Sequence, residues 1–335
     1  MANPFIHWIA AKGAFAPWLF LALFIAASVL MIWRLEAMSA RGFEGTVLGT
    51  LVMPYCSGMG NLILAFIYGC NGLNGADIVA NNLVNNVTNM TLVLGLPAIF
   101  WGMGISTAKK KSGKKSGGAV KTRELNRLSL LLTLTAVLFF TGVVWALGRK
   151  GRLDSSDGLV LVGLFLFWQC IHVFEVLKSN VRQGKSIFGW MLPLDLALLA
   201  VGAYAIYVST DWLVHWVQIS AKHGFVQSHF GWVSGWITVL PNALLAFYYG
   251  WRGHPETVYA SQVGDCHVSI PLCIGIYALY QTMAMPAFFH LGMFILLGAT
   301  LAHFFCVLIF GRLPRIAGII LVAAYGIFLW KGLLG

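Results

Sequence analysis

Charged side chains are scarce in this sequence: Asp, Glu, Lys and Arg together make up 10% of its 335 residues, whereas 59% are hydrophobic. A soluble domain carries roughly 25% charged residues. This shortage excludes a soluble protein, and the long apolar runs predict an all-α polytopic membrane protein. The sequence also has no P-loop, dinucleotide-binding glycine fingerprint, nucleophile elbow or HExxH motif, so we expect no enzyme.

Cysteine is sparse as well. The six cysteines fall almost entirely within the apolar runs, and they form neither a CxxC pair nor a Cys/His spacing that suits zinc. Buried thiols usually serve as small core side chains. We therefore expect no cofactor.

Apolar runs of roughly 20 residues each predict transmembrane helices. Ten such runs lie near 17–33, 44–68, 77–103, 128–147, 158–177, 188–208, 227–250, 257–282, 287–310 and 314–334. Of the 22 lysines and arginines, 16 lie in loops that follow the odd-numbered runs. Cytoplasmic loops carry the excess of Lys and Arg, so both termini are expected outside. The expected location is a bacterial cytoplasmic (inner) membrane.

One loop, residues 104–127, carries much of the net charge of +11. Its stretch AKKKSGKKSGG is basic and rich in Gly and Ser, which is typical of a flexible linker that lies against anionic lipid. No folded soluble domain accompanies the loop, so a nucleic-acid partner is not expected. The lipid bilayer is the expected surrounding of the chain.

Asparagine is concentrated in one apolar segment, ADIVANNLVNNVTNMTLVLG (residues 76–95). A side-chain amide that enters an apolar medium without partners costs roughly 2–7 kcal/mol. Four of the five asparagines, at positions 82, 85, 86 and 89, follow the spacing of one helix face. The pattern predicts a polar stripe whose partners lie elsewhere in the chain.

The chain contains an internal repeat. Residues 59–72 (MGNLILAFIYGCNG) align with 240–253 (LPNALLAFYYGWRG) without a gap, and seven of 14 positions are identical. After a one-residue insertion, 79–95 aligns with 259–275. The polar stripe is paired as follows: Asn81 with Ser261, Asn82 with Gln262, Asn85 with Asp265, Asn86 with Cys266, and Asn89 with Ser269.

The two copies are predicted to insert in opposite orientations. Five spans separate them, and an odd number reverses the direction of the chain across the membrane. We therefore expect two inverted five-helix repeats, residues 1–178 and 179–335, with repeat motifs at 57–95 and 238–275. Inverted repeats are typical of secondary transporters, which bind their substrate near the midplane between the repeats.

The repeat motifs resemble those of the cation/calcium exchanger superfamily, which includes the sodium/calcium exchangers. Each family repeat has a GTSxPE stretch and, further on, a GNxxGSNxxN/D-like stretch. The corresponding stretches here are YCSGMGNLILAFIYG with NNLVNNVTN, and GWITVLPNALLAFYYGWRG with ASQVGDCHVS. The resemblance implies ten spans, with the inverted repeats in spans 2–3 and 7–8, and transport of cations by alternating access.

This sequence departs from the family pattern at its charged positions. The acidic residue after the proline, which is a principal calcium ligand in the family, corresponds to Asn61 and Asn242. The serine of GSN corresponds to Asn85 and Asp265, and the last acidic or amide position to Asn89 and Ser269. The resemblance also places Ser57 and Thr238 at the GTS positions that help to bind ions.

We therefore expect a charge-poor cation site. Asp265 is the expected charged ligand or proton carrier, and neutral oxygens are expected from Asn61, Asn242, Asn85, Asn89, Ser269, Ser57 and Thr238. Calcium affinity depends largely on the number of charged ligands. One carboxylate better suits bound Na⁺ or a proton than Ca²⁺.

Alternative interpretations stay open at this point. The loss of both motif glutamates is also consistent with an exchanger-derived subunit or scaffold that no longer exchanges ions and has partner subunits, and a neutral site could carry another small solute. Asp195 is either a further functional group within the membrane or the partner of a loop lysine. His290 and His303 in the ninth span are interpreted as core or interfacial residues.

Overall fold

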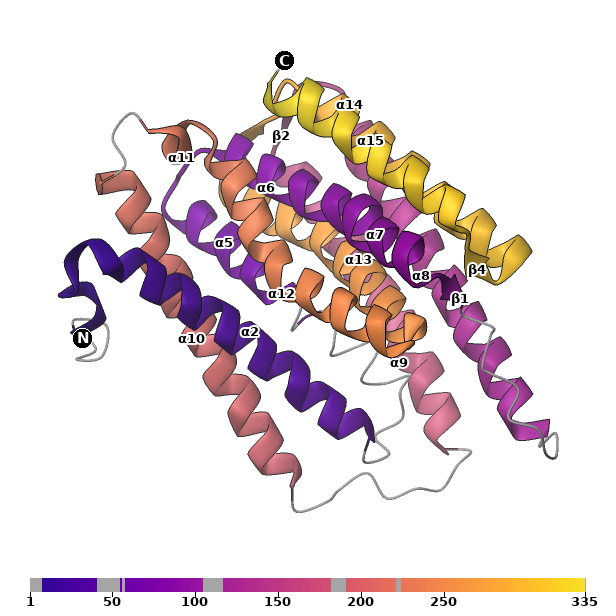
Figure 1. Cartoon of the computed structure of the whole chain (residues 1–335). Coiled ribbons are helices and arrows are strands. Elements are labelled where there is room, and N and C mark those ends of the chain that lie inside the picture. Colours follow the sequence, from indigo (N-terminus) through magenta and orange to yellow (C-terminus); the bar gives the residue numbers. More distant parts are fainter. Residues whose placement is uncertain are drawn as a thin grey trace.

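The structure is a computed structural model and describes residues 8–40, 55, 58–104, 117–181, 191–220 and 224–334. Helices make up nearly all of this part of the chain (Figure 1). Eight helices in it are long and apolar enough to cross a membrane, and Met59–Cys70 and Ser155–Ile171 are shorter apolar helices. Each overlaps one predicted span. The all-α polytopic fold is confirmed, and the number of crossings stays a prediction.

The repeat motifs and their neighbours form the following elements. The first half contains η1 (Gly13–Phe15), α2 (Ala16–Ala40), α5 (Met59–Cys70), α6 (Gly75–Thr88), the π-helix η3 (Asn89–Val93), α7 (Leu94–Phe100), α8 (Gly117–Gly148) and α9 (Ser155–Val181). The second half contains α10 (Leu192–Ser220), α11 (Phe225–Ser228), α12 (Phe230–Arg252), α13 (Pro255–Tyr280), α14 (Phe289–Phe305), the π-helix η4 (Cys306–Phe310) and α15 (Arg315–Leu333).

Part of the basic loop differs from the sequence prediction. Residues 117–127 belong to α8, whereas 105–116 lie outside the described residues. The sequence KTRELNRL (121–128) is rich in Lys, Arg, Glu and Leu, which are good helix formers. The helix of the fourth span therefore begins well before its apolar part.

Two short antiparallel strand pairs join the ends of the helices. β1 (Met103–Gly104) pairs with β4 (Arg312–Leu313), with Met103 opposite Leu313. β2 (Arg152–Leu153) pairs with β3 (Met283–Ala284), with Leu153 opposite Met283. Each pair joins one strand from the first half of the chain to one from the second, so the halves are tied together at these ends.

The two repeat copies run in opposite directions. Tyr68, near the end of α5, stacks on Phe230 at the start of α12, with ring centroids 5.5 Å apart. Gly75, at the start of α6, lies so close to Tyr277, near the end of α13, that an added Cβ would be 2.7 Å from its ring. These contacts show the inverted repeat directly.

Helices α2 and α10 lie side by side, next to the repeat helices (Figure 1). Phe20 stacks on Trp212 at a centroid distance of 4.2 Å. Arg34 forms an ion pair with Asp195 at 2.9 Å, and the Asp195 side chain is only 2% exposed. The structural partner of Asp195 is therefore an arginine of α2 rather than a loop lysine, and a functional role for Asp195 stays a prediction.

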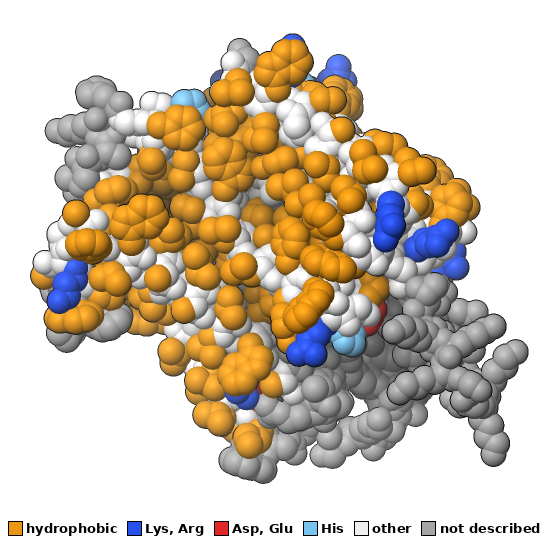
Figure 2. All heavy atoms as spheres, in the orientation of Figure 1, with side chains coloured by type: hydrophobic (Ala, Val, Ile, Leu, Met, Phe, Trp, Pro, Cys, Tyr) orange, Lys and Arg blue, Asp and Glu red, His pale blue; other side chains and the backbone are white. Residues whose placement is uncertain are grey.

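The outer surface is largely apolar. Figure 2 shows hydrophobic side chains over most of one face, with Lys and Arg near its margins. Large exposed side chains include Trp18, Phe167 and Ile316. This is the surface expected of an integral membrane protein. Gly332, at the end of α15, is close to Trp232 at the start of α12, and Ala14, just before α2, lines a cavity together with Phe230 at the start of α12. The beginning of α2 and the end of α15 therefore both lie toward the end of the molecule where α12 starts.

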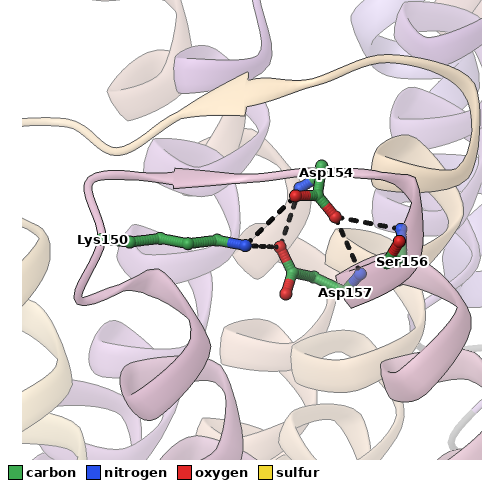
Figure 3. Close-up of polar contacts among 4 residues, drawn as sticks. All are labelled: Lys150, Asp154, Ser156 and Asp157. Atoms are coloured by element: carbon green, nitrogen blue, oxygen red, sulfur yellow. Dashed lines mark hydrogen bonds and ion pairs between the residues drawn. The ribbon is translucent and has the colours of Figure 1, made fainter.

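A reciprocal cap begins α9, and Figure 3 shows its side chains. Asp154 Oδ1 accepts hydrogen bonds from the backbone N–H groups of Ser156 and Asp157, at 3.0 and 3.2 Å. Asp157 Oδ2 accepts from the Asp154 N–H at 2.9 Å, which completes a capping box. The Lys150 ammonium lies 3.1 Å from Asp154 and 2.7 Å from Asp157, and it offsets their charge.

Candidate functional site

Asp265 lies in the middle of α13, and its side chain is completely buried. Its Oδ2 atom accepts hydrogen bonds from three side-chain amides: Asn85 at 3.0 Å, Asn89 at 2.8 Å and Asn242 at 3.1 Å. We call these four residues the amide–carboxylate cluster. Two of the amides come from the first repeat and one from the second, so the cluster lies between the two copies.

The local helix geometry explains why these residues meet. Asn85 and Asn89 are four residues apart, at the end of α6 and the start of η3, and therefore share one helix face. Asn242 directly follows Pro241 within α12. Because α6 and α13 run antiparallel, the polar face of each can lie against that of the other at mid-length. The side-chain N–H groups of Asn85, Asn89 and Asn242 are thus compensated by hydrogen bonds.

A second, closed network lies beside this cluster on the same helices. The Ser269 hydroxyl donates to Asn86 Oδ1 at 2.8 Å. Asn82 Nδ2 donates to the Ser269 carbonyl at 2.7 Å, and Asn86 Nδ2 donates to Asn82 Oδ1 at 3.0 Å. The structure therefore places Ser269 with Asn82 and Asn86 rather than in contact with the Asp265 carboxylate.

Several buried oxygens near Asp265 accept no hydrogen bond within the described part of the chain. They are Asn89 Oδ1, Asn242 Oδ1, Gln262 Oε1 and Asp265 Oδ1. The amide of Asn61 on α5 has no hydrogen-bond partner for either Nδ2 or Oδ1 within the described residues. Gln262 belongs to this region because its Nε2 donates to the Asn242 carbonyl at 3.1 Å. A buried acceptor without a donor is costly. One carboxylate oxygen and several amide oxygens are also the hard ligands that small cations prefer.

Of the remaining predicted residues, Thr238 lies at the side of the cluster that faces α2. The Thr238 hydroxyl is 3.3 Å from Asn85 Oδ1 and 3.0 Å from the Gly235 carbonyl. Asn61 is 2% exposed, and it follows Gly60, where an added Cβ would be 3.4 Å from Thr238. Ser57 lies outside the described residues.

A cavity of about 360 Å³ leads from one end of the molecule toward Thr238. It lies between the α2–α10 pair and the helices α5 and α12, and its walls are mostly apolar, with Ser234 and Thr238 among the polar side chains. The Phe24 ring also lines it and is packed on Gly60, where a Cβ would be 2.8 Å from the ring. Phe24 and Gly60 are thus neighbouring parts of the cavity wall.

The sequence did not reveal two buried partners of the polar stripes. Ser234 on α12 accepts a hydrogen bond from Asn81 at 3.1 Å. His303 on α14 contacts Met90 and Tyr259. A lone serine or histidine in an apolar helix carries no spacing signal, so only the three-dimensional contacts identify them.

The sequence profile of the family described as sodium/calcium exchanger protein matches residues 13–174 and 194–331. The chain belongs to this family. Both repeat motifs and the whole amide–carboxylate cluster fall within the matched residues. Family membership supports cation-exchange transport, in agreement with the resemblance noted in the sequence. No curated protein is similar enough in sequence to match the chain.

Solved structures of the sodium-calcium exchanger NCX_Mj have the same fold. The structure soaked with 10 mM Na⁺ and 10 mM Sr²⁺ matches with a TM-score of 0.66 at 19% identity, over 93% of this chain and 95% of that one. The structure soaked with zero Na⁺ and Ca²⁺ matches with a TM-score of 0.64 at 19% identity, over 93% and 96%. The similarity covers nearly the full length of both chains.

The candidate site is poor in charge. Within the described residues, no three His, Cys, Asp or Glu side chains gather as they would around a metal ion. Amides stand at the two positions, Asn61 and Asn242, where the family motif has its acidic residues. The donor set therefore consists of one carboxylate and several neutral oxygens.

Proposed function

We propose that the protein is a secondary active transporter that binds a monovalent cation, Na⁺ or H⁺, at the amide–carboxylate cluster and moves it by alternating access. Family membership supports cation exchange in general. The observation that supports the monovalent preference is the single buried carboxylate of Asp265 among the amides of Asn85, Asn89 and Asn242.

A monovalent and a divalent cation lose different amounts of electrostatic attraction when a carboxylate of the site is replaced by an amide. Two unit charges about 4 Å apart attract by about 4 kcal/mol at an effective dielectric constant of about 20. A dication loses about twice as much as a monovalent ion when one carboxylate is replaced by an amide. The asparagines at positions 61 and 242 therefore weaken Ca²⁺ binding far more than Na⁺ binding.

We further propose that α2 and α10 move as one unit against the repeat helices. The Arg34–Asp195 ion pair and the stacking of Phe20 on Trp212 hold the two helices together. The cavity beside them would open the cluster to one side of the membrane. The distribution of Lys and Arg supports an outside location for both termini, and a bacterial inner membrane is the proposed location.

The test compares the purified wild type with Asp265→Asn. Thermal unfolding is followed in NaCl, KCl and CaCl₂ and over a range of pH, and ion flux is measured in proteoliposomes. At a free cation concentration of about 100 times Kd, binding adds about 2.7 kcal/mol to the free energy of unfolding. We expect Na⁺ or pH to give such a stabilisation in the wild type and not in Asp265→Asn.

The control is Asp77→Asn, which removes a carboxylate from the first turn of α6 outside the cluster. It should keep the cation response. A Ca²⁺ flux that persists in Asp265→Asn would contradict the proposal. A wild type with no cation response and no flux, purified with a stoichiometric partner, would instead favour the exchanger-derived scaffold.

A further inference from the structure

The first repeat helix changes its hydrogen bonding at the point where it contributes Asn89 to the cluster. Asn89 is the first residue of the π-helix η3. The N–H of Leu94 bonds to the carbonyls of Asn89 and Thr91, whereas in a regular α-helix it would bond to Met90. The Met90 carbonyl, beside Asn89, thereby loses its usual donor. π-Turns within α-helices often occur at functional sites.

A side chain from another helix supplies a donor to this carbonyl. His303, on α14, has its Nε2 atom 2.8 Å from the Met90 carbonyl oxygen. The Nδ1 atom of the same ring is 3.2 Å from the Tyr259 hydroxyl. Both side chains are completely buried, and Tyr259 lies on α13, the helix that carries Asp265. The imidazole therefore connects the helix of Asn89 with the helix of Asp265.

The donor and acceptor roles follow from the chemistry of these groups. A carbonyl oxygen only accepts, so His303 Nε2 carries the hydrogen and donates it to Met90. In the neutral ring Nδ1 is then an acceptor, and the Tyr259 hydroxyl donates to it. Both ring nitrogens are thus engaged: Nε2 donates to the Met90 backbone carbonyl, and Nδ1 accepts from the Tyr259 hydroxyl. Because neither nitrogen faces the cluster, His303 acts through Asn89 rather than on a bound cation.

We infer that His303, oriented by Tyr259, is a positioning residue for the cation site: it holds the π-turn at Met90 so that Asn89 reaches Asp265. The second repeat differs at this point, because Pro271 stands at the position equivalent to Thr91 and has no N–H to donate to the carbonyl four residues earlier. The inference depends on the proposed function, since its consequence is a weaker cation site when the support is removed.

Three variants and one control test the inference. His303→Leu removes both hydrogen bonds, Tyr259→Phe removes only the donor to Nδ1, and His303→Gln keeps an amide N–H that can donate to Met90. His290→Leu is the matched control, since His290 lies on the same helix and is exposed. The apparent Kd for the stabilising cation is measured by thermal unfolding in increasing NaCl or over a range of pH.

We expect His303→Leu to weaken cation binding by about 10- to 100-fold, which is the usual effect of removing a group that orients a ligand. Tyr259→Phe should weaken it less, and His303→Gln should recover most of the affinity, which a purely space-filling role would not produce. His290→Leu should match the wild type. Equal affinity in His303→Leu and the wild type, or no recovery in His303→Gln, would overturn the inference.

Backbone hydrogen exchange of residues 89–95 separates this inference from the proposed function. The amides of this segment should exchange faster in His303→Leu and not in His290→Leu, whether or not a cation binds. If the wild type responds to no cation, the proposed function fails, and the exchange data still decide whether His303 holds the π-turn. Unchanged exchange in His303→Leu would refute that support.

Discussion

The first repeat copy, α5 to α7, and the second copy, α12 and α13, follow the same path in opposite directions. A glycine with positive φ follows the first helix of each copy: Gly72 has φ 63° and Gly253 has φ 76°. Another such pair precedes the strands β2 and β4, with Gly151 at φ 82° and Gly311 at φ 60°. The backbone turns are therefore repeated as closely as the sequence motif.

The close helix contacts are also repeated. An added Cβ on Gly318 of α15 would be 2.8 Å from the Gly95 carbonyl of α7. An added Cβ on Gly158 of α9 would be 2.9 Å from the Gly275 carbonyl of α13. Gly95 and Gly275 are equivalent positions in the repeat alignment. Both copies thus pack the helical segment that follows their polar stripe against a glycine of the last helix in the other half of the chain.

The chemistry of the two copies is different. Asp265 in the second copy stands where the first copy has Asn85, and the three donors to its Oδ2 include Asn85 and Asn89 of the first copy. The helix of the first copy is interrupted by a π-turn, whereas that of the second is a continuous α-helix with Pro271 inside it. The two copies therefore share their helix packing, whereas only the second copy supplies a carboxylate to the cluster.

Restoring acidic residues to both copies should have the largest effect. Asn61→Glu combined with Asn242→Glu raises the site from one carboxylate to three. Because calcium affinity depends strongly on the number of charged ligands, Ca²⁺ should bind about 100-fold more tightly or better. Calcium binding is measured by calorimetry on the purified protein. Asn61→Gln with Asn242→Gln is the control for side-chain volume, and an equal gain in that variant would refute the electrostatic explanation.

Moving the charge from the second copy to the first tests the twofold relation of the site. Asp265→Asn alone should weaken binding of the stabilising cation by about 100-fold, or about 2.7 kcal/mol. Adding Asn85→Asp should recover the affinity to within about tenfold of the wild type, because the two side chains are hydrogen-bonded at 3.0 Å and the charge moves only a short distance. Titration by thermal unfolding measures both variants.

The control for this exchange places the new carboxylate in the second network, as Asp265→Asn with Asn86→Asp. Asn86 contacts Ser269 and Asn82 rather than Asp265. Little recovery is expected in this control. If the two double variants bind the cation equally well, the position of the charge in the cluster is not what matters.

Substituting alanine for the tightly packed glycines should lower stability by similar amounts in the two copies. Gly158→Ala and Gly318→Ala each force a Cβ against backbone at 2.8 Å, and overpacking of this kind costs about 1–3 kcal/mol. Their controls, Gly163→Ala on α9 and Gly326→Ala on α15, meet nothing within 4 Å. We expect lower Tm values for the first two variants only, by similar amounts. A large effect in one copy alone would contradict the packing equivalence.

Much of the fold follows from the sequence, because many residues of one segment together indicate each helix and each repeat. The apolar runs predict the helices, and shared Asn, Tyr and Gly residues at 59–72 and 240–253 predict the inverted repeat. The spacing of Asn82, Asn85, Asn86 and Asn89 predicts the polar face. The meeting of that face with Asp265 follows from the opposite orientation of the copies, which the structure shows.

The remaining details depend on contacts between distant segments. The π-turn at Asn89–Val93 contains neither Gly nor Pro, so no local pattern distinguishes it. The division of the stripe between Asp265 and Ser269 depends on which rotamers fit between α6 and α13. Asp195 pairs with Arg34 on a helix 161 residues away along the chain, and single basic residues give no pairing signal.

The smallest effect is expected at the cap of α9, which the second copy lacks. Asp154 accepts from two backbone N–H groups, whereas its counterpart before α15 is Pro314, which makes no side-chain cap. The Asp157 N–H and the Lys150 ammonium lower the pKa of Asp154. A lowered pKa stabilises the fold above the ordinary aspartate pKa of about 3.9, and this contribution is lost as the pH falls through the lowered value.

Asp154→Ala should therefore unfold at a lower temperature than the wild type at neutral pH, by less than either glycine variant, and the difference in Tm should shrink as the solution becomes strongly acidic. Ser155→Ala is the control, because Ser155 is exposed in the same turn and should leave Tm unchanged at every pH. Thermal unfolding in detergent over a series of pH values measures both. A difference in Tm that stays constant into strong acid would mean that Asp154 acts through the shape of the turn alone. The caps of α9 and α15 would then differ in sequence but not in their electrostatic effect.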